Sequence, residues 1–286
     1  MPKEIFEESK GIAKIVQVVL ITFFCLLFSV VIVLSIPGNR ENSAWILSAQ
    51  SIQTIVLFIF PAVIVAFLWN KAPKEYYHLS KKISWKTFLV LVMTVLLMVP
   101  FINLLSELNH AVHFPEALNE YETQIRNSEL ESHLRTEKLL STDNLLFFVI
   151  RLITVAMIPA CCEELFFRGC LQNVIREWKG KHVAAWSVGI IFSLIHFQIF
   201  NFLPRLLWGV LFAYLLIWSG SLWLPTVAHF VNNGIIVLYY FLKAKEMNIP
   251  DINTVGTGDT LYVGIISLLV TVGGLCFIRK VLIKTS

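Results

Sequence analysis

The chain has 286 residues, of which 57% are hydrophobic and 15% are charged, and its formal net charge is +4. Soluble globular domains are about 45–50% apolar and about 25% charged, so this composition excludes that class and indicates a multi-pass membrane protein. The positive charge is small and no long basic tract carries it. We therefore expect no nucleic-acid partner.

Hydrophobic runs predict the elements in chain order, because a membrane-spanning helix needs about 20 mostly apolar residues. Such runs lie at residues 13–36, 45–69, 87–105, 145–170, 184–200, 204–219, 222–242 and 261–279. We predict an all-α fold, a polytopic membrane helix bundle of about eight transmembrane helices. Lysine and arginine in the short loops favour the side that holds both termini, which predicts cytoplasmic termini.

The runs divide the chain into three segments. We expect an N-terminal membrane region of three helices, a catalytic core, and a loop with the final helix, at residues 1–144, 145–242 and 243–286. The first segment ends in a polar connector, residues 107–143. Leucine and isoleucine recur there at helical spacing after Pro115, which predicts an amphipathic surface helix. That helix is either a solvated connector or a cap over the bundle.

The stretch "PACCEELFFRG" places three ionisable residues inside the fourth apolar run. One ionised group at a helix centre costs about 2.5–3.5 kcal/mol on insertion scales, so such residues usually face the bundle interior and carry out chemistry or transport. Glu164 and Arg168 are four residues apart and can pair on one helix face. Glu163 points about 100° away and is the expected reactive group.

Two further stretches carry polar groups at membrane depth. "FSLIH" places Phe192 and His196 four residues apart, and "HFVNN" does the same for His229 and Asn233. In lipid these side chains have few other partners, so we expect them to meet Glu163 in one polar pocket. Their depths along the helices place that pocket in the inner half of the bilayer, open toward the cytoplasm.

These three stretches together resemble the motifs of the CPBP (also called ABI) intramembrane proteases, which include the CAAX prenyl proteases of the Ras-converting type. The family pattern is E-E-x-x-x-R, then F-x-x-x-H, then H-x-x-x-N, and all three motifs occur here in order. The resemblance covers residues 145–242. It implies an eight-helix membrane bundle and hydrolysis of a peptide bond.

The resemblance also implies roles for single residues. Glu163 would be the general base, and His196 would position and activate the water. His229 and Asn233 would stabilise the oxyanion of the tetrahedral intermediate. The supporting residues of the motifs are Glu164, Arg168 and Phe192.

The family is often labelled a metalloprotease, so a metal site needs a test. If zinc is bound, Glu163, His196 and His229 are the expected ligands, because a carboxylate and two imidazoles can hold zinc and leave a position for water. These residues lie far apart in the sequence and no H-E-x-x-H motif occurs. We favour a metal-free reaction, with zinc as the alternative cofactor and a bis-histidine haem as a further alternative.

Other functions also fit part of the pattern. A proton-coupled transporter would use Glu163, His196 and His229 as a relay, but the acidic motif has no second copy of the kind that repeated transporter folds show. A non-catalytic membrane scaffold is a third possibility. "GTGD" at residues 256–259 matches part of an aspartyl protease motif, but it lies in a polar loop and is typical of a turn.

No motif outside the family resemblance bears on the substrate. The resemblance implies a membrane-embedded, prenylated or leader-peptide substrate in contact with the lipid bilayer. No targeting sequence precedes the first apolar run, so we expect an integral, multi-pass protein of a bacterial plasma membrane.

Overall fold

The computed structural model describes residue 6, residues 9–69 and residues 72–284. Helices are the regular structure in these ranges, and the described residues contain no strand. The all-α prediction is therefore confirmed.

The helices follow one another with short connections. The α-helices are α2 (Ile12–Ser35), α3 (Ser43–Thr54), α4 (Phe60–Leu68), α5 (Pro73–Tyr76), α6 (Trp85–Leu97), α7 (Val99–His110), α8 (Asn119–Leu140), α9 (Leu145–Arg151), α10 (Ile158–Glu164), α11 (Gln172–Lys179), α12 (Lys181–Leu194), α13 (Phe202–Ser219), α14 (Trp223–Ala244) and α15 (Leu261–Lys284). The π-helical segments are η1 (Ile55–Ile59), η3 (Leu152–Met157) and η4 (Leu165–Leu171), and the 3₁₀ turns are η2 (Glu116–Leu118), η5 (Ile199–Asn201) and η6 (Gly258–Thr260).

Among the described residues, five helices are long and apolar enough to cross a membrane, and a sixth is formed if α6 and α7, bent by 41° at their junction, count as one span. Helices also occupy the two remaining predicted ranges. However, α12 has only 14 residues, and α14 carries the polar residues of the third motif and does not meet the same criteria. The eight helices are present, but eight membrane crossings stay a prediction.

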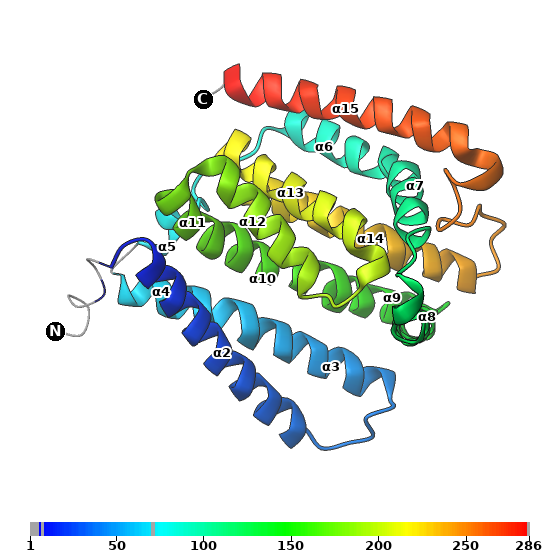
Figure 1. The fold of residues 1–286 in the computed structure, drawn as a ribbon, viewed down its shortest axis with the longest axis horizontal. Helices are drawn as coiled ribbons and strands as arrows, with labels where there is room; N and C mark the ends of the chain where they lie inside the picture. The colour runs from blue at the N-terminus through cyan, green and yellow to red at the C-terminus, as the bar shows by residue number, and fades with distance from the viewer. Residues whose placement is uncertain (1–5, 7–8, 70–71, 285–286) are drawn as a thin grey trace.

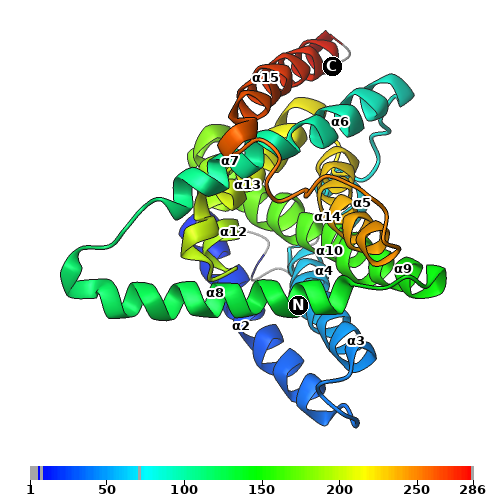
Figure 2. The same ribbon diagram turned by 90° about the vertical axis from the view of Figure 1, so that its right-hand side faces the viewer.

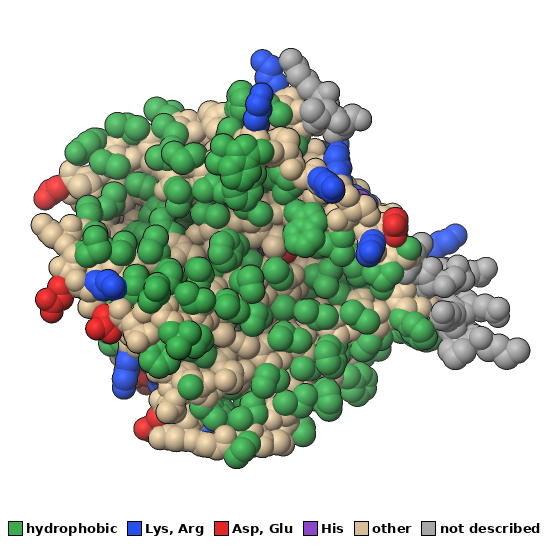
Figure 3. Space-filling view, turned by 180° about the vertical axis from the view of Figure 1, so that it is seen from behind, with side chains coloured by type: hydrophobic (Ala, Val, Ile, Leu, Met, Phe, Trp, Pro, Cys, Tyr) green, Lys and Arg blue, Asp and Glu red, His purple; other side chains and the backbone are tan. Residues whose placement is uncertain are grey.

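Apart from α8, which Figure 1 shows end-on, the long helices run in roughly the same direction and form a bundle with two distinct ends. Helix α2 begins and α15 ends at one end, and α8 lies at the other. Figure 2 shows α8 extended across that second end, and Figure 3 shows a broad hydrophobic surface between the ends, with basic side chains mostly toward the end where α15 stops. Cytoplasmic termini agree with this charge distribution and stay a prediction.

Small residues bring two central helices into close contact. Helices α12 and α13 pack against each other, and a Cβ atom added to Gly209 would lie 2.8 Å from the Cα atom of Gly189. Only glycine at both positions permits this backbone approach. The contact fixes the wall of the bundle behind the three motifs.

The polar connector contains the helix that was predicted after Pro115, namely α8. Its apolar residues Leu130 and Leu134 are 58% and 53% exposed, whereas Glu129 is 8% exposed and Leu140 is 1% exposed. Helix α8 is therefore held to the bundle by its acids and its C-terminal end. This arrangement favours the cap over the solvated connector.

Candidate active site

The acidic motif forms a buried ion pair along one helix. The Arg168 guanidinium donates from Nη1 to Glu164 Oε1 at 2.9 Å, and both side chains are fully buried. Nη2 of Arg168 donates to the Gly209 carbonyl at 3.0 Å, and the Phe192 ring lies 4.7 Å from the guanidinium carbon. The predicted pairing of Glu164 with Arg168 is confirmed.

Glu164 also binds His229, a contact that the sequence did not predict. His229 Nδ1 lies 2.8 Å from Glu164 Oε1. A carboxylate can only accept, so we assign the proton to Nδ1. The His229 ring stacks on Phe212, with ring centroids 5.0 Å apart. One carboxylate oxygen therefore fixes both the arginine of its own helix and the imidazole of α14.

Glu163 has a different environment from its neighbour. Its side chain is 14% exposed, and its Oε2 lies 4.0 Å from His229 Nε2. Among the described residues the Glu163 carboxylate accepts no hydrogen bond within 3.5 Å. Glu163 is thus unpaired within its own helix, as predicted, and is available to a substrate or a water.

A cavity of about 500 Å³ brings the predicted reactive groups together. Its lining includes Glu163 from α10, His196 beyond α12, and His229 and Asn233 from α14. The supporting residue Phe192 also faces the cavity. The structure therefore gathers one acid, two imidazoles and one amide from three separate stretches of the chain.

His196 lies two residues beyond the last residue of α12. Its Nδ1 lies 2.6 Å from the carbonyl oxygen of Phe192, which can only accept a hydrogen bond. The proton is therefore on Nδ1, and the neutral ring presents Nε2 as an acceptor. The next residue, Phe197, has a φ of 53° and is 88% exposed, so the chain turns sharply after the histidine.

Two contacts hold Asn233. Its Nδ2 lies 3.4 Å from the Val155 carbonyl oxygen of η3, and Asn232 Nδ2 donates to Asn233 Oδ1 at 3.2 Å. Pro159 has no N–H, so this carbonyl cannot accept an α-helical bond from the residue four positions on. The contacts orient the Asn233 amide with an N–H group toward η3.

The location of the cavity differs from the expectation. Thr136 and Leu140 of α8 line it, so it extends toward the α8 end of the bundle, opposite to the end where α15 stops (Figure 1). We expected the pocket at the end that holds the termini. The run 184–200 was interpreted as a full span, but α12 ends at Leu194, so His196 lies at a helix end and not deep inside a helix.

The three candidate zinc ligands do not fit a metal centre. Within the described ranges, no three His, Cys, Asp or Glu side chains are placed to hold a metal ion. Nδ1 of both His196 and His229 is bonded to protein oxygen, which leaves only Nε2 of each ring open. We therefore derive no reaction step through a metal.

Sequence reasoning missed four polar residues of the cavity: Thr136, Asn201, Arg205 and Asn232. Arg205 lies in the first turn of α13, where a lone cation resembles an ordinary residue of the membrane interface. Asn201 is in a short loop, and Asn232 points about 100° away from its neighbour Asn233 on the helix. Only the fold shows that these residues face the site.

Comparisons with known proteins agree with the motifs. Residues 145–235 match the family model for type II CAAX prenyl endopeptidase Rce1-like proteins, which confirms the predicted resemblance. An uncharacterized protein, YpbD of Bacillus subtilis (strain 168), is 27% identical over 88 residues, which are 29% of this chain and 42% of YpbD. The chain thus matches less than half the length of that relative. No solved structure matches.

Proposed function

Since residues 145–235 are similar to the Rce1-like type II CAAX prenyl endopeptidases, we propose that the chain is an intramembrane endopeptidase that cleaves a membrane-associated or lipidated substrate. The observation that carries this proposal is the single cavity lined by Glu163, His196, His229 and Asn233. These are the side chains that water activation and oxyanion stabilisation need.

In this proposal Glu163 is the general base. Its carboxylate takes a proton from a water as the water oxygen attacks the carbonyl carbon of the scissile bond. His196 accepts a hydrogen bond from the same water at Nε2, since its Nδ1 donates to Phe192. When the tetrahedral intermediate collapses, the proton on Glu163 passes to the leaving nitrogen, the C–N bond breaks, and the carboxylate is regenerated.

His229 and Asn233 would stabilise the oxyanion. The bond from His229 Nδ1 to Glu164 means that Nε2 donates only in the imidazolium form. The buried Glu164 carboxylate accepts the Nδ1–H bond, and Arg168 keeps the carboxylate in place. The Asn233 amide supplies a neutral donor.

The substrate proposal follows from the location of the site. The apolar helices indicate an integral membrane protein, and the family description names prenylated CAAX substrates. A prenylated peptide or a membrane-bound precursor with a leader segment would reach the cavity from the bilayer. We propose residues 145–242 as the catalytic core and a bacterial plasma membrane as its location.

Peptide release tests the proposal. Purified protein in detergent is incubated with an internally quenched peptide that ends in a farnesylated CAAX sequence. We expect Glu163→Gln to lower kcat/KM by at least about 10²-fold, because a neutral amide cannot accept the water proton. The matched control is Cys161→Ser, an exposed residue two positions away. Cleavage by Glu163→Gln at the wild-type rate would contradict the proposal.

A second variant separates hydrolysis from proton transport. We expect Asn233→Ala to lower kcat by about 10²–10³-fold, as removal of one oxyanion donor typically does. A relay through Glu163, His196 and His229 has no need for this amide. In cells, the Glu163→Gln variant should accumulate one uncleaved membrane precursor, which comparative proteomics would identify.

A further inference from the structure

Arg205 is a cation of the candidate active site that has no ion-pair partner within 4.0 Å among the described residues. It lies in the first turn of α13, and its side chain lines the same cavity as Glu163 and His196. Its Nη2 donates to the side-chain oxygen of Gln198. Its Nε is buried and has no hydrogen-bond partner. The side chain is therefore held in place by one neutral contact, with most of its donors unused.

Among the described residues, no acid forms a close ion pair with this guanidinium, and Glu163 and Glu129 act on it only from a greater distance. Across the described part of the chain, no carboxylate oxygen lies within 4.0 Å of Arg205. Arg168, the other arginine behind the cavity, differs because it pairs with Glu164 and with a backbone carbonyl. Arg205 is half-buried with a buried Nε, and a partly desolvated charge without a close counter-charge is costly, so an anion on a ligand would be favoured there.

The acids nearest to Arg205 either bind other groups or are needed for the proposed reaction. Glu164 binds Arg168 and His229. Glu129 accepts the Phe200 N–H at Oε1 and the Asn201 amide at Oε2. Glu163 faces the cavity and is the group that the proposed reaction needs as a free base. None of these described carboxylates pairs with Arg205, so a substrate can supply the close anion.

We propose that Arg205 is a specificity-determining residue that binds a carboxylate of the substrate close to the bond that is cut. This inference rests on the proposed function, because it places the substrate in the cavity of Glu163. A guanidinium presents planar N–H donors that match a carboxylate, and charge-assisted bonds of this kind are about twice as strong as neutral ones. The carboxylate is either the C-terminus of the substrate or an acidic side chain.

Binding measurements in the Glu163→Gln background test this inference without turnover. Three fluorescent farnesylated peptides are compared: one with a free C-terminal carboxylate, one with a C-terminal amide and no acid, and one with a C-terminal amide and one glutamate beside the scissile bond. We expect at least about a tenfold lower Kd for one of the two acidic peptides than for the neutral peptide. The tighter peptide identifies which carboxylate Arg205 binds.

Variants at Arg205 complete the test. Arg205→Gln should raise the Kd of the preferred acidic peptide to that of the neutral peptide and leave the neutral peptide unchanged. Arg205→Lys should keep part of the preference, because it retains the charge but not the planar donors. Arg135→Gln, on the exposed face of α8, is the matched control and should keep the full preference.

Two results would overturn the assignment. One is an equal Kd for the three peptides, and the other is a loss of binding by Arg205→Gln that is the same for acidic and neutral peptides, as a general structural role would give. The protein with Glu163 intact separates this inference from the proposed function. Selective binding without cleavage would overturn hydrolysis only, whereas cleavage without any acid preference would overturn the role of Arg205 only.

Discussion

Two adjacent glutamates of α10 have opposite surroundings. Glu164 is fully buried and contacts Arg168 and His229 through one oxygen. Glu163 is partly exposed to the cavity and has no bonded partner nearer than 4.0 Å. Neighbouring residues on a helix point about 100° apart. Glu164 therefore faces the buried interior, whereas Glu163 faces the cavity.

The first prediction concerns Glu164. Glu164→Gln keeps the side-chain shape but leaves the Arg168 charge buried without a counter-charge, which typically costs about 3–5 kcal/mol. We expect a clearly lower thermal unfolding temperature in detergent, followed by tryptophan fluorescence. Glu163→Gln is the matched control and should unfold close to wild type. An equal loss of stability in both variants would show that the two acids do not differ in this way.

Local spacing explains which contacts could be predicted. The pairing of Glu164 with Arg168 follows from their separation of four residues on a helix. The hydrogen bond between His229 and Glu164 joins residues 65 positions apart. Helical spacing in the sequence cannot predict a contact over that separation. Arg205 was missed for the same reason, since its neighbours in the cavity come from other helices.

At the scale of the elements, α12 and α13 depend on two facing glycines. A Cβ atom on Gly209 would lie 2.8 Å from Gly189 Cα and 3.0 Å from its carbonyl oxygen, both backbone atoms that cannot move aside alone. The carbonyl of Gly209 also accepts a hydrogen bond from Arg168. The distance between these two helices therefore affects the arginine behind the active site.

The second prediction follows from this contact. Gly209→Ala should force α12 and α13 apart, which lowers the unfolding temperature and weakens the Arg168 bond to the residue 209 carbonyl. Gly273→Ala is the matched control, because a Cβ at Gly273 has no neighbour within 4 Å. Differential scanning fluorimetry measures both variants. A Gly209→Ala protein that melts with wild type would show that the helices separate at little cost.

Hydropathy predicted where helices exist better than how they end. All eight predicted ranges contain a helix. The run 184–200 continues with apolar residues after Leu194, so composition alone could not show that α12 stops there. The run 87–105 contains Pro100, and the structure bends by 41° between α6 and α7 at that point.

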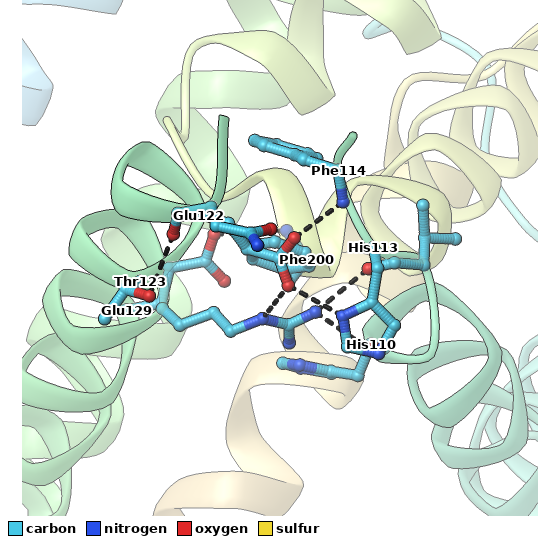
Figure 4. A network of polar contacts seen from close by, with 10 residues as sticks. His110, His113, Phe114, Glu122, Thr123, Glu129 and Phe200 are labelled. Carbon is cyan, nitrogen blue, oxygen red and sulfur yellow. Dashed lines mark hydrogen bonds and ion pairs between the residues drawn. The ribbon is translucent and has the colours of Figure 1, made fainter. Parts of the chain in front are cut away.

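At the scale of the whole molecule, α8 crosses one end of the bundle and is anchored by a polar network. Glu122 accepts hydrogen bonds from the Phe114 N–H at 2.6 Å and Arg126 Nε at 2.8 Å, and its Oε1 lies 2.9 Å from His113 Nδ1. Figure 4 shows these groups beside Phe200 and Glu129. The Phe114 N–H, with Arg126 and His113, lowers the pKa of the Glu122 carboxyl to about 2.

The third prediction is a pH dependence of this anchor. The pKa of Glu122 is lower in the folded protein than its ordinary value of 4.5, so its contribution is complete above pH 4.5 and is lost as the pH falls toward 2. The hydrogen-exchange protection of α8, measured relative to the intrinsic exchange rate at each pH, should therefore fall over that range. Glu122→Gln should lack the charged anchor and exchange faster already at neutral pH.

The control for this prediction lies on the same helix. Glu131 pairs with Arg135 on the exposed face, so Glu131→Gln should keep the acid-dependent protection of α8. The groups that face Glu122 are Arg126 of α8 and His113 of the preceding loop. If α8 of Glu122→Gln exchanged as slowly as wild type at neutral pH, the anchor would lie elsewhere.

Helices α7 and α8 hold the loop that follows His196, which affects how chimaeras of this protein can be designed. Asn109 of α7 accepts the Leu203 N–H at 2.7 Å, and Glu129 of α8 accepts the Phe200 N–H at 3.1 Å. Both acceptors lie outside residues 145–235, the part shared with the Rce1-like family. A chimaera that exchanges only the shared part would carry the loop after His196 into a host without these acceptors, so α7 and α8 should be exchanged together with it.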